Sequence, residues 1–141
     1  MPRIQKLTPN LIVSSVEKSL AFYEGVLGFA RGMTVPEQPP LVFASVTSGA
    51  FEIFFNDRTT VAKESPQMGG LAFGGGNTMF VEIEGDGEGT PKTAIDAYHD
   101  QIKDRVNIVM PLVTQWYGMR EFAIVDPDGY VITFAERVQT N

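Results

Sequence analysis

Cysteine is absent from the 141 residues of this chain, and histidine occurs once, as His99. Without cysteine, disulfide bonds, thiolate nucleophiles and cysteine-ligated zinc are all excluded. A metal site, if there is one, has to be built from oxygen ligands or from that single imidazole. His99 follows Tyr98 in a polar stretch typical of a solvated helix, so we assign it no role.

Basic side chains are also scarce: 11 Lys and Arg residues stand against 17 Asp and Glu residues, a formal charge of -6. This balance disfavours binding along a phosphate backbone and favours neutral or cationic ligands. The N-terminus has no signal-peptide pattern, and no apolar run approaches the roughly 18 residues of a membrane span. We therefore expect a cytoplasmic protein that binds neither nucleic acid nor membranes.

What the chain does contain is apolar material for a core, with 43% hydrophobic and 11% aromatic residues. The first half predicts one helix among short strands. Ser14 and Glu17 have the spacing of a capping box, and Gly28 suits the position just past a helix end. The apolar stripe of this helix is Val16, Leu20, Tyr23 and Leu27. Apolar runs predict strands at 6–13, 29–35, 41–46 and 50–55.

A second half repeats this order after a segment, 57–77, that lacks apolar periodicity and carries glycine clusters. We expect that segment to be a linker or a lid without regular elements. Thr90 and Pro91 fit a helix N-cap followed by proline, ahead of a stripe of Ile95, Tyr98 and Ile102. Strands are predicted at 78–83, 107–113, 120–125 and 130–135, and the last two are joined by a type I turn at 126–129.

Two halves of the same order indicate an internal duplication. We predict an α+β fold in a single domain, residues 1–141, made of two tandem βαβββ modules at 5–57 and 77–138 with a linker at 58–76. One helix covers only one face of a four-stranded sheet. The mixed sheet is therefore expected to curve around a cavity, with the helices on its outer face, and the cavity is the expected ligand site.

Three stretches of the chain, taken together, resemble the vicinal-oxygen-chelate superfamily. They are TPNLIVSS at 8–15, FYEGVLGF at 22–29 and YGMREFAIVDPDGY at 117–130. This superfamily contains glyoxalases, dioxygenases, fosfomycin-resistance enzymes and bleomycin-resistance proteins, and the run before the final hairpin is most similar to the last group. The resemblance implies a homodimer that holds a small molecule, as bleomycin-resistance proteins hold a cationic glycopeptide without reacting with it.

Metal-dependent members of that superfamily place one ligand on each of four cavity strands. Carried onto this sequence, these positions fall at Thr8 or Asn10, at Glu52, near Thr78 and at Thr133. Only Glu52 is a good ligand, and one carboxylate with neutral hydroxyls does not hold a divalent ion well against water. We therefore expect neither a metal nor another cofactor.

Candidate ligand-binding residues come from the strands and from the turn before the final hairpin. Glu52 alternates with apolar neighbours and is expected to face the cavity, where it can anchor a cation, act as a general base, or be a structural carboxylate bonded to Arg31, Arg120 or a hydroxyl. Aromatic pairs stack flat or cationic ligands but are more often core residues. The remaining candidates are Phe43, Phe54, Trp116, Tyr117, Arg120, Phe122 and Thr133.

These residues are compatible with three functions. The first is a metal-free protein that binds an apolar, aromatic or cationic small molecule, as in drug sequestration. The second is a lyase or isomerase of the glyoxalase-like class that depends on Glu52 or on a weakly held metal. The third is an accessory or scaffold protein whose cavity is filled by its own side chains. The fold alone does not choose among them.

Overall fold

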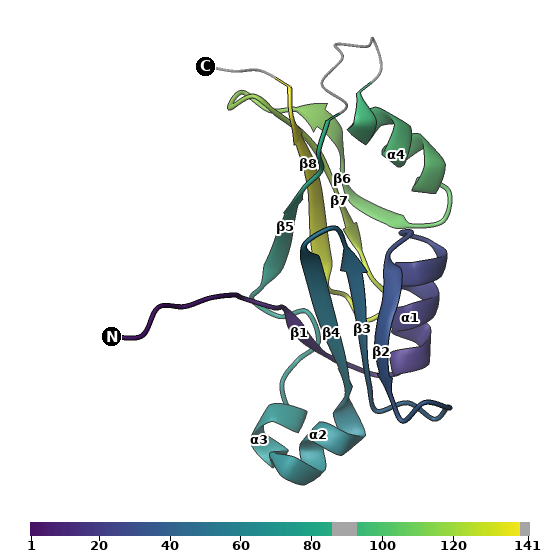
Figure 1. The fold of residues 1–141 in the computed structure, drawn as a ribbon. Coiled ribbons are helices and arrows are strands. Elements are labelled where there is room, and N and C mark those ends of the chain that lie inside the picture. The colour runs from purple at the N-terminus through teal and green to yellow at the C-terminus, as the bar shows by residue number, and fades with distance from the viewer. Residues whose placement is uncertain (86–92, 139–141) are drawn as a thin grey trace. The chain divides into compact units, whose positions relative to one another are not determined.

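The computed structural model describes residues 1–85 and 93–138 and divides the chain into two compact units, Met1–Phe73 and Gly74–Asn141. Each unit has the order strand, helix, three strands (Figure 1), so the predicted α+β class with tandem modules is confirmed. The first unit contains β1 (Asn10–Val13), α1 (Val16–Gly25), β2 (Ala30–Val35), β3 (Phe43–Ser48), β4 (Phe51–Asp57), α2 (Arg58–Glu64) and α3 (Pro66–Gly69). The second contains β5 (Thr78–Glu82), α4 (Ala94–Ile102), β6 (Asn107–Thr114), β7 (Met119–Val125) and β8 (Val131–Arg137).

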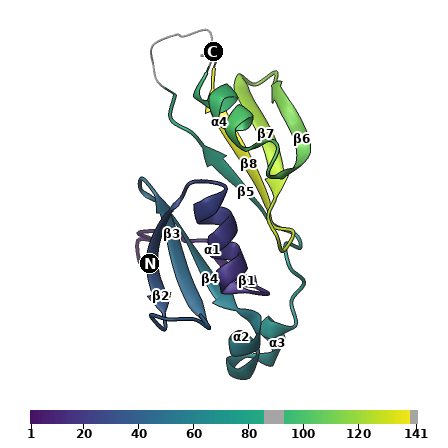
Figure 2. The ribbon, with the colours of Figure 1, turned by 90° about the vertical axis from the view of Figure 1, so that its right-hand side faces the viewer.

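Each unit forms its own four-stranded sheet, in the order β1-β4-β3-β2 and β5-β8-β7-β6. The first strand of each unit pairs parallel with the last, and the other neighbours are antiparallel. Helix α1 packs on one face of the first sheet, and α4 packs on one face of the second (Figures 1 and 2). We call the face opposite the packed helix the distal face of each sheet.

The core of the first unit lies between α1 and its sheet. The four residues predicted to form the apolar stripe are all buried, although Leu27 lies past the end of α1, which stops at Gly25. The ring of Tyr23 lies with its centroid 4.9 Å from that of Phe55 on β4, and 5.9 Å from that of Phe29. Because side chains alternate along a strand, Ile53 and Phe55 point toward α1, and Glu52 and Phe54 point to the distal face.

Helix α1 begins one residue later than the capping-box pattern predicts. Its N-cap is Ser15, whose side chain accepts a hydrogen bond from the amide of Lys18, so the assignment of Ser14 as the cap is wrong. Glu17 does not complete a capping box either. Its carboxylate accepts a hydrogen bond from the amide of Leu41 at 2.5 Å, which lowers its pKa and ties the β2–β3 connection to the start of the helix.

The prediction that 57–77 lacks regular elements is also wrong, because α2 and α3 occupy part of it. Both helices start from good caps: Asp57 accepts from the amide of Thr60, and Ser65 accepts from the amide of Met68 with Pro66 at the first helical position. Neither helix has a buried residue. Because neither helix has a buried face, apolar periodicity could not predict them. The sequence feature that indicates them is the N-cap residue at the start of each helix.

In the second unit, Ile95 and Ile102 of α4 are buried as predicted. The predicted caps Thr90 and Pro91 lie outside the described residues, and the helix takes Thr93 as its N-cap. The predicted turn at 126–129 is present, since the amide of Gly129 donates to the carbonyl of Asp126 at 3.0 Å. Among residues 1–85 and 93–138, no helix has the length and apolar character needed to cross a membrane.

Candidate functional site

The direction of each side chain on β7 decides which predicted site residues lie together. Phe122 has no exposed surface, and its ring centroid lies 5.0 Å from that of His99 and 6.5 Å from that of Tyr98, both on α4. The burial of Tyr98 raises the pKa of its phenol. Phe122 is therefore a core residue of the helix side, which is the ordinary explanation for an aromatic at strand spacing.

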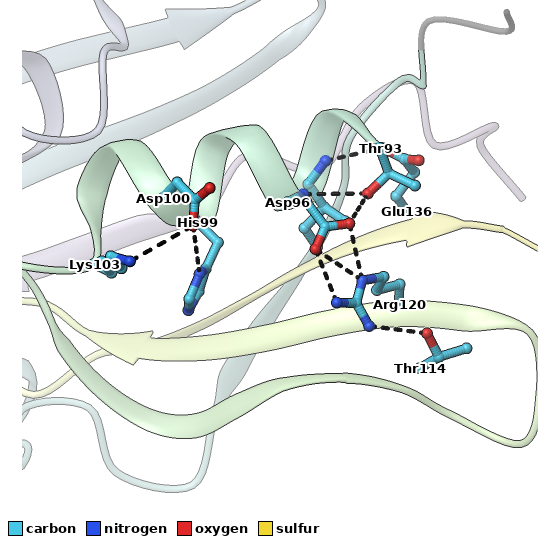
Figure 3. A network of polar contacts seen from close by, with 9 residues as sticks. Thr93, Asp96, His99, Asp100, Lys103, Thr114, Arg120 and Glu136 are labelled. Atoms are coloured by element: carbon cyan, nitrogen blue, oxygen red, sulfur yellow. Dashed lines mark hydrogen bonds and ion pairs between the residues drawn. The ribbon is translucent and has the colours of Figure 1, made fainter. Parts of the chain in front are cut away.

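Arg120 lies on the same face of β7 as Phe122, because side chains two residues apart on a strand share a face. Figure 3 shows its guanidinium group beside Asp96 of α4. Its guanidinium donates to both carboxylate oxygens of Asp96 at 2.8–3.2 Å and to the hydroxyl of Thr114 at 3.1 Å. The hydrogen bonds from Arg120 and Thr93 lower the pKa of Asp96 to about 2, and the same pair raises the pKa of Arg120. This contact ties the first turn of α4 to β7, away from the distal face.

Glu121, between these two residues, points to the distal face of the second sheet. It is only 4% exposed, and its Oε1 accepts a hydrogen bond from the hydroxyl of Tyr117 at 2.5 Å. Its other oxygen, Oε2, is buried and has no hydrogen-bond partner among the described residues. The sequence analysis did not single out Glu121. The pattern that could have identified it is the alternation of side chains along the strand. Because Phe122 is a core aromatic, the adjacent Glu121 must face the other side of the sheet.

Trp116 and Tyr117 occupy the tight turn between β6 and β7. The amide of Gly118 donates to the carbonyl of Gln115 at 3.0 Å, and the amide of Gln115 donates to the carbonyl of Met119 at 2.7 Å. Gly118 has a φ of +87°, which only glycine adopts readily at this point of the turn. Trp116 therefore sits at the tip of the turn and is 88% exposed, with its ring edge-to-face on Tyr117 at 5.3 Å.

Strand register places further residues beside Glu121 on the distal face. Ala135 of β8 pairs with Glu121 on one side and with Glu82 of β5 on the other. The next row contains Thr133, which pairs with Phe80 and with Ala123. Thr133 is half-buried and Phe80 is exposed. Two carboxylates, a hydroxyl and an exposed phenylalanine thus surround small alanine side chains on this face. The hydrogen bond from Tyr117 to Glu121 also raises the pKa of that tyrosine.

The distal face of the first sheet carries the other candidates. Glu52 forms an ion pair with Lys6 at 2.7 Å and not with either arginine considered from the sequence. Register pairs Phe43 with Asn56, on the same face as Glu52 and Phe54, and the rings of Phe43 and Phe54 lie 5.2 Å apart. The structure therefore brings Glu52, Phe43 and Phe54 to one face.

The positions equivalent to metal ligands carry few groups able to bind a metal. Asn10 is hydrogen-bonded to Asn56, and Thr78 lies on β5 opposite Val131. Within residues 1–85 and 93–138, no three His, Asp or Glu side chains gather closely enough to hold a metal ion. The prediction that this protein uses no metal stays a prediction.

Comparison with known proteins assigns the family. The family model of the Glyoxalase/Bleomycin resistance protein/Dioxygenase superfamily matches residues 3–134. This chain belongs to that superfamily. The match covers β1 through most of β8, so it includes both units and both distal faces.

Among relatives in this superfamily are bleomycin resistance proteins of Geobacillus stearothermophilus and Staphylococcus aureus. Each is 27% identical to this chain over 137 residues, covering 94% of this chain and 96% of the relative. The likeness therefore extends over nearly the full length of both proteins.

Solved structures show the same fold, and one of them is described as a member of this superfamily. TioX from Micromonospora sp. ML1 has a TM-score of 0.71 at 15% identity, covering 95% of this chain and 99% of that one. A superfamily member from Sphaerobacter thermophilus has a TM-score of 0.70 at 22% identity, covering 94% and 98%. At these identities the likeness concerns the fold alone.

Proposed function

We propose that this superfamily member binds a small aromatic or cationic molecule on the distal faces of its sheets and sequesters it without converting it. The observation that carries the proposal is the group formed by Trp116, Tyr117 and Glu121: an almost fully exposed indole, packed on a tyrosine whose hydroxyl is bonded to a buried carboxylate. The relatives named bleomycin resistance proteins support an aromatic or cationic molecule as the ligand.

Trp116 is unusual because a large apolar ring at the tip of a turn is left in water. Such a ring supports no core, and together with Tyr117 it forms an exposed aromatic pair that is suited to contact with a partner or a ligand. An indole is also the best aromatic platform for a cation, at roughly 0.5–2 kcal/mol per contact. Flat rings stack on the same surface.

The first unit supports a cationic ligand as well. Glu52 on its distal face already holds an ammonium group, that of Lys6, whose side chain is 57% exposed. An exposed ion pair is weak, at about 0–1 kcal/mol, and a competing cation can exchange with it. Phe43 and Phe54 supply an aromatic surface on the same face. The formal charge of -6 adds a general attraction for cations.

Assembly as a metal-free homodimer in the cytoplasm completes the proposal. Edge strands carry partly exposed apolar side chains, which are suited to contact with a second copy. On β2 these are Met33 at 65% and Val35 at 42% exposure, and on β6 they are Val109, Met110 and Val113 at 40–47%. Sedimentation velocity measures the assembly directly, and a sample that remains monomeric at about 100 μM contradicts it.

The chain contains a single tryptophan, so fluorescence excited selectively at tryptophan, and not at the four tyrosines, reports on Trp116. Titration with bleomycin is expected to change that fluorescence saturably, and calorimetry is expected to give the same affinity. Trp116→Ala should weaken the calorimetric affinity at least about tenfold, the equivalent of 1.4 kcal/mol. Leu71→Ala, which removes another exposed apolar side chain, should leave it unchanged.

Sequestration also predicts that the ligand is recovered intact. Mass spectrometry after overnight incubation with a molar excess of protein should return bleomycin of unchanged mass. A modified product whose formation is lost in Glu52→Gln would overturn sequestration and favour the Glu-dependent enzyme. Equal affinity in the wild type and in Trp116→Ala would exclude the turn as the binding site.

A further inference from the structure

We infer that Glu121 is the anionic anchor of this site and that it selects ligands carrying a positively charged N–H donor, such as a primary ammonium, amidinium or guanidinium group. The inference rests on the proposed function and narrows its ligand class. It assigns to Glu121 a role in recognition that neither the family match nor the sequence motifs specify.

One carboxylate oxygen of Glu121 lacks a hydrogen-bond partner among the described residues. Oε2 is buried and accepts no hydrogen bond among the described residues, although the residue is only 4% exposed. An ionised carboxylate that leaves one oxygen unpaired in a buried position is costly, and such groups are rare in folded proteins. The cost is relieved when a bound ligand supplies the missing donor.

The described residues provide no basic partner for the Glu121 carboxylate. Of the basic side chains that strand register places near Glu121, Arg120 points to the opposite face and is held by Asp96. Arg137 shares the distal face, where it pairs with Met119, and it is exposed. No salt bridge joins Glu121 to a basic side chain in the parts of the chain that the structure describes. The charge of this carboxylate is therefore not compensated by a basic side chain of the described residues, and an external cation can supply that compensation.

The turn between β6 and β7 lies beside Glu121 and connects it to the exposed ring of Trp116. Tyr117, whose hydroxyl holds Oε1, is 38% exposed and lies in the same turn as Trp116. A ligand whose ring stacks on Trp116 can extend past Tyr117 and place a nitrogen toward Oε2 of Glu121. Tyr117 is then a positioning residue that occupies one carboxylate oxygen and leaves the other for the ligand.

A set of three probes separates charge from hydrogen bonding. Benzylammonium has both charge and N–H donors, benzyltrimethylammonium has the charge alone, and benzyl alcohol has a donor without charge. Binding is measured by Trp116 fluorescence and by ligand-observed NMR. We expect the wild-type protein to prefer benzylammonium over both other probes by about tenfold or more, the range of one charge-assisted hydrogen bond.

Glu121→Gln is expected to abolish that preference, because the amide keeps the shape of the side chain but loses the charge. The same variant should have an unchanged or raised melting temperature, since it removes a buried, half-paired carboxylate. Glu64→Gln is the control: it removes an exposed carboxylate of α2, which belongs to neither distal face, and should keep the preference within about twofold. Tyr117→Phe, which frees Oε1 as well, should bind benzylammonium as tightly as the wild type or more tightly.

The outcomes separate this inference from the proposed function. If bleomycin binding is lost in Trp116→Ala but unchanged in Glu121→Gln, the inference that Glu121 is the anionic anchor is wrong, and the proposed function is not contradicted. Equal affinity of the wild type for benzylammonium and benzyltrimethylammonium also overturns the anchor. If Glu121→Gln melts several degrees lower and keeps the preference for benzylammonium, Glu121 is a structural carboxylate and the inference is wrong. A wild-type protein that binds neither bleomycin nor benzylammonium overturns both proposals.

Discussion

Consecutive residues of β7 face opposite sides of the second sheet, so some contact α4 and others face the proposed ligand site. Arg120 and Phe122 face α4, where the first binds Asp96 and the second is fully buried. Glu121 faces the other way and keeps an unpaired oxygen. Because side chains alternate along a strand, three consecutive residues divide between stabilising the unit and, as we propose, receiving a ligand.

Phe122 and Phe80, two of the phenylalanines of the second sheet, test this division at the scale of single residues. Phe122 is fully buried, and Phe80 on β5 is 54% exposed on the distal face. Phe122→Ala should lower the free energy of unfolding by about 3–5 kcal/mol, the usual cost of a cavity in a core. Phe80→Ala should change it by less than about 0.5 kcal/mol. Urea denaturation measures both, and equal costs would contradict the assignment of faces.

At the scale of elements, α4 is attached to its sheet by polar contacts near its first turn (Figure 3). Thr93 caps the helix, Asp96 binds Arg120, and the carboxylate of Glu136 on β8 accepts from the amide of Ile95 at 3.0 Å. Negative charge at this end of a helix also interacts favourably with the helix dipole. The helix is thus oriented by carboxylates and not by apolar packing alone.

The lowered pKa of Asp96 gives this attachment a defined pH dependence. Its pKa falls from 3.8 to about 2 on folding, so its contribution is complete above pH 3.8 and is lost as the pH falls through about 2. Because the pair is partly exposed, we expect that contribution to be about 1 kcal/mol. The stability difference between the wild type and Asp96→Asn should therefore shrink between pH 5 and pH 2.

Asp100→Asn, a change at a half-exposed carboxylate of the same helix, is the control for this experiment. Its difference from the wild type should be smaller at pH 5. Urea denaturation at a series of pH values measures both differences. A difference for Asp96→Asn that stays constant down to pH 2 would show that the Arg120 contact does not stabilise the folded state.

The caps of α2 and α3 make a second prediction at the scale of elements. Asp57→Ala and Ser65→Ala each remove the side chain that accepts an amide at a helix start, at a typical cost of about 1 kcal/mol. Because neither helix buries a residue, the loss should appear as faster amide exchange at Thr60 and Met68 and not as a lower global stability. Ser48→Ala, outside these helices, should leave both exchange rates unchanged.

At the scale of the whole molecule, the charge of -6 acts on every cationic ligand that approaches. Raising the salt from about 20 mM to about 500 mM shortens the Debye length from roughly 20 Å to under 5 Å. Benzylammonium affinity should then fall severalfold, and benzyl alcohol affinity should stay constant. Calorimetry or NMR at both salt concentrations measures the difference, and an equal response of the two probes would show that long-range charge plays no part.

Much of this architecture could be predicted from the sequence, because it depends on local patterns. The duplicated order of elements, the buried stripe of α1 and the turn at 126–129 follow from periodicity and turn chemistry, and all three are confirmed. The sequence placed the cap of α1 one residue early and missed α2 and α3. Adjacent serines compete for the same cap, and exposed helices carry no apolar period.

The candidate site was predicted less well, because it depends on which face each strand turns to its helix. Composition alone excluded thiol chemistry and favoured cationic ligands, and the motifs indicated the superfamily. Only the tertiary structure decided that Arg120 and Phe122 serve the core, that Lys6 is the partner of Glu52, and that Glu121 has an unpaired oxygen beside Tyr117. The alternation of side chains along a strand is a local property. Which of the two faces of the strand is buried depends on where the helix packs and on partners distant in the chain.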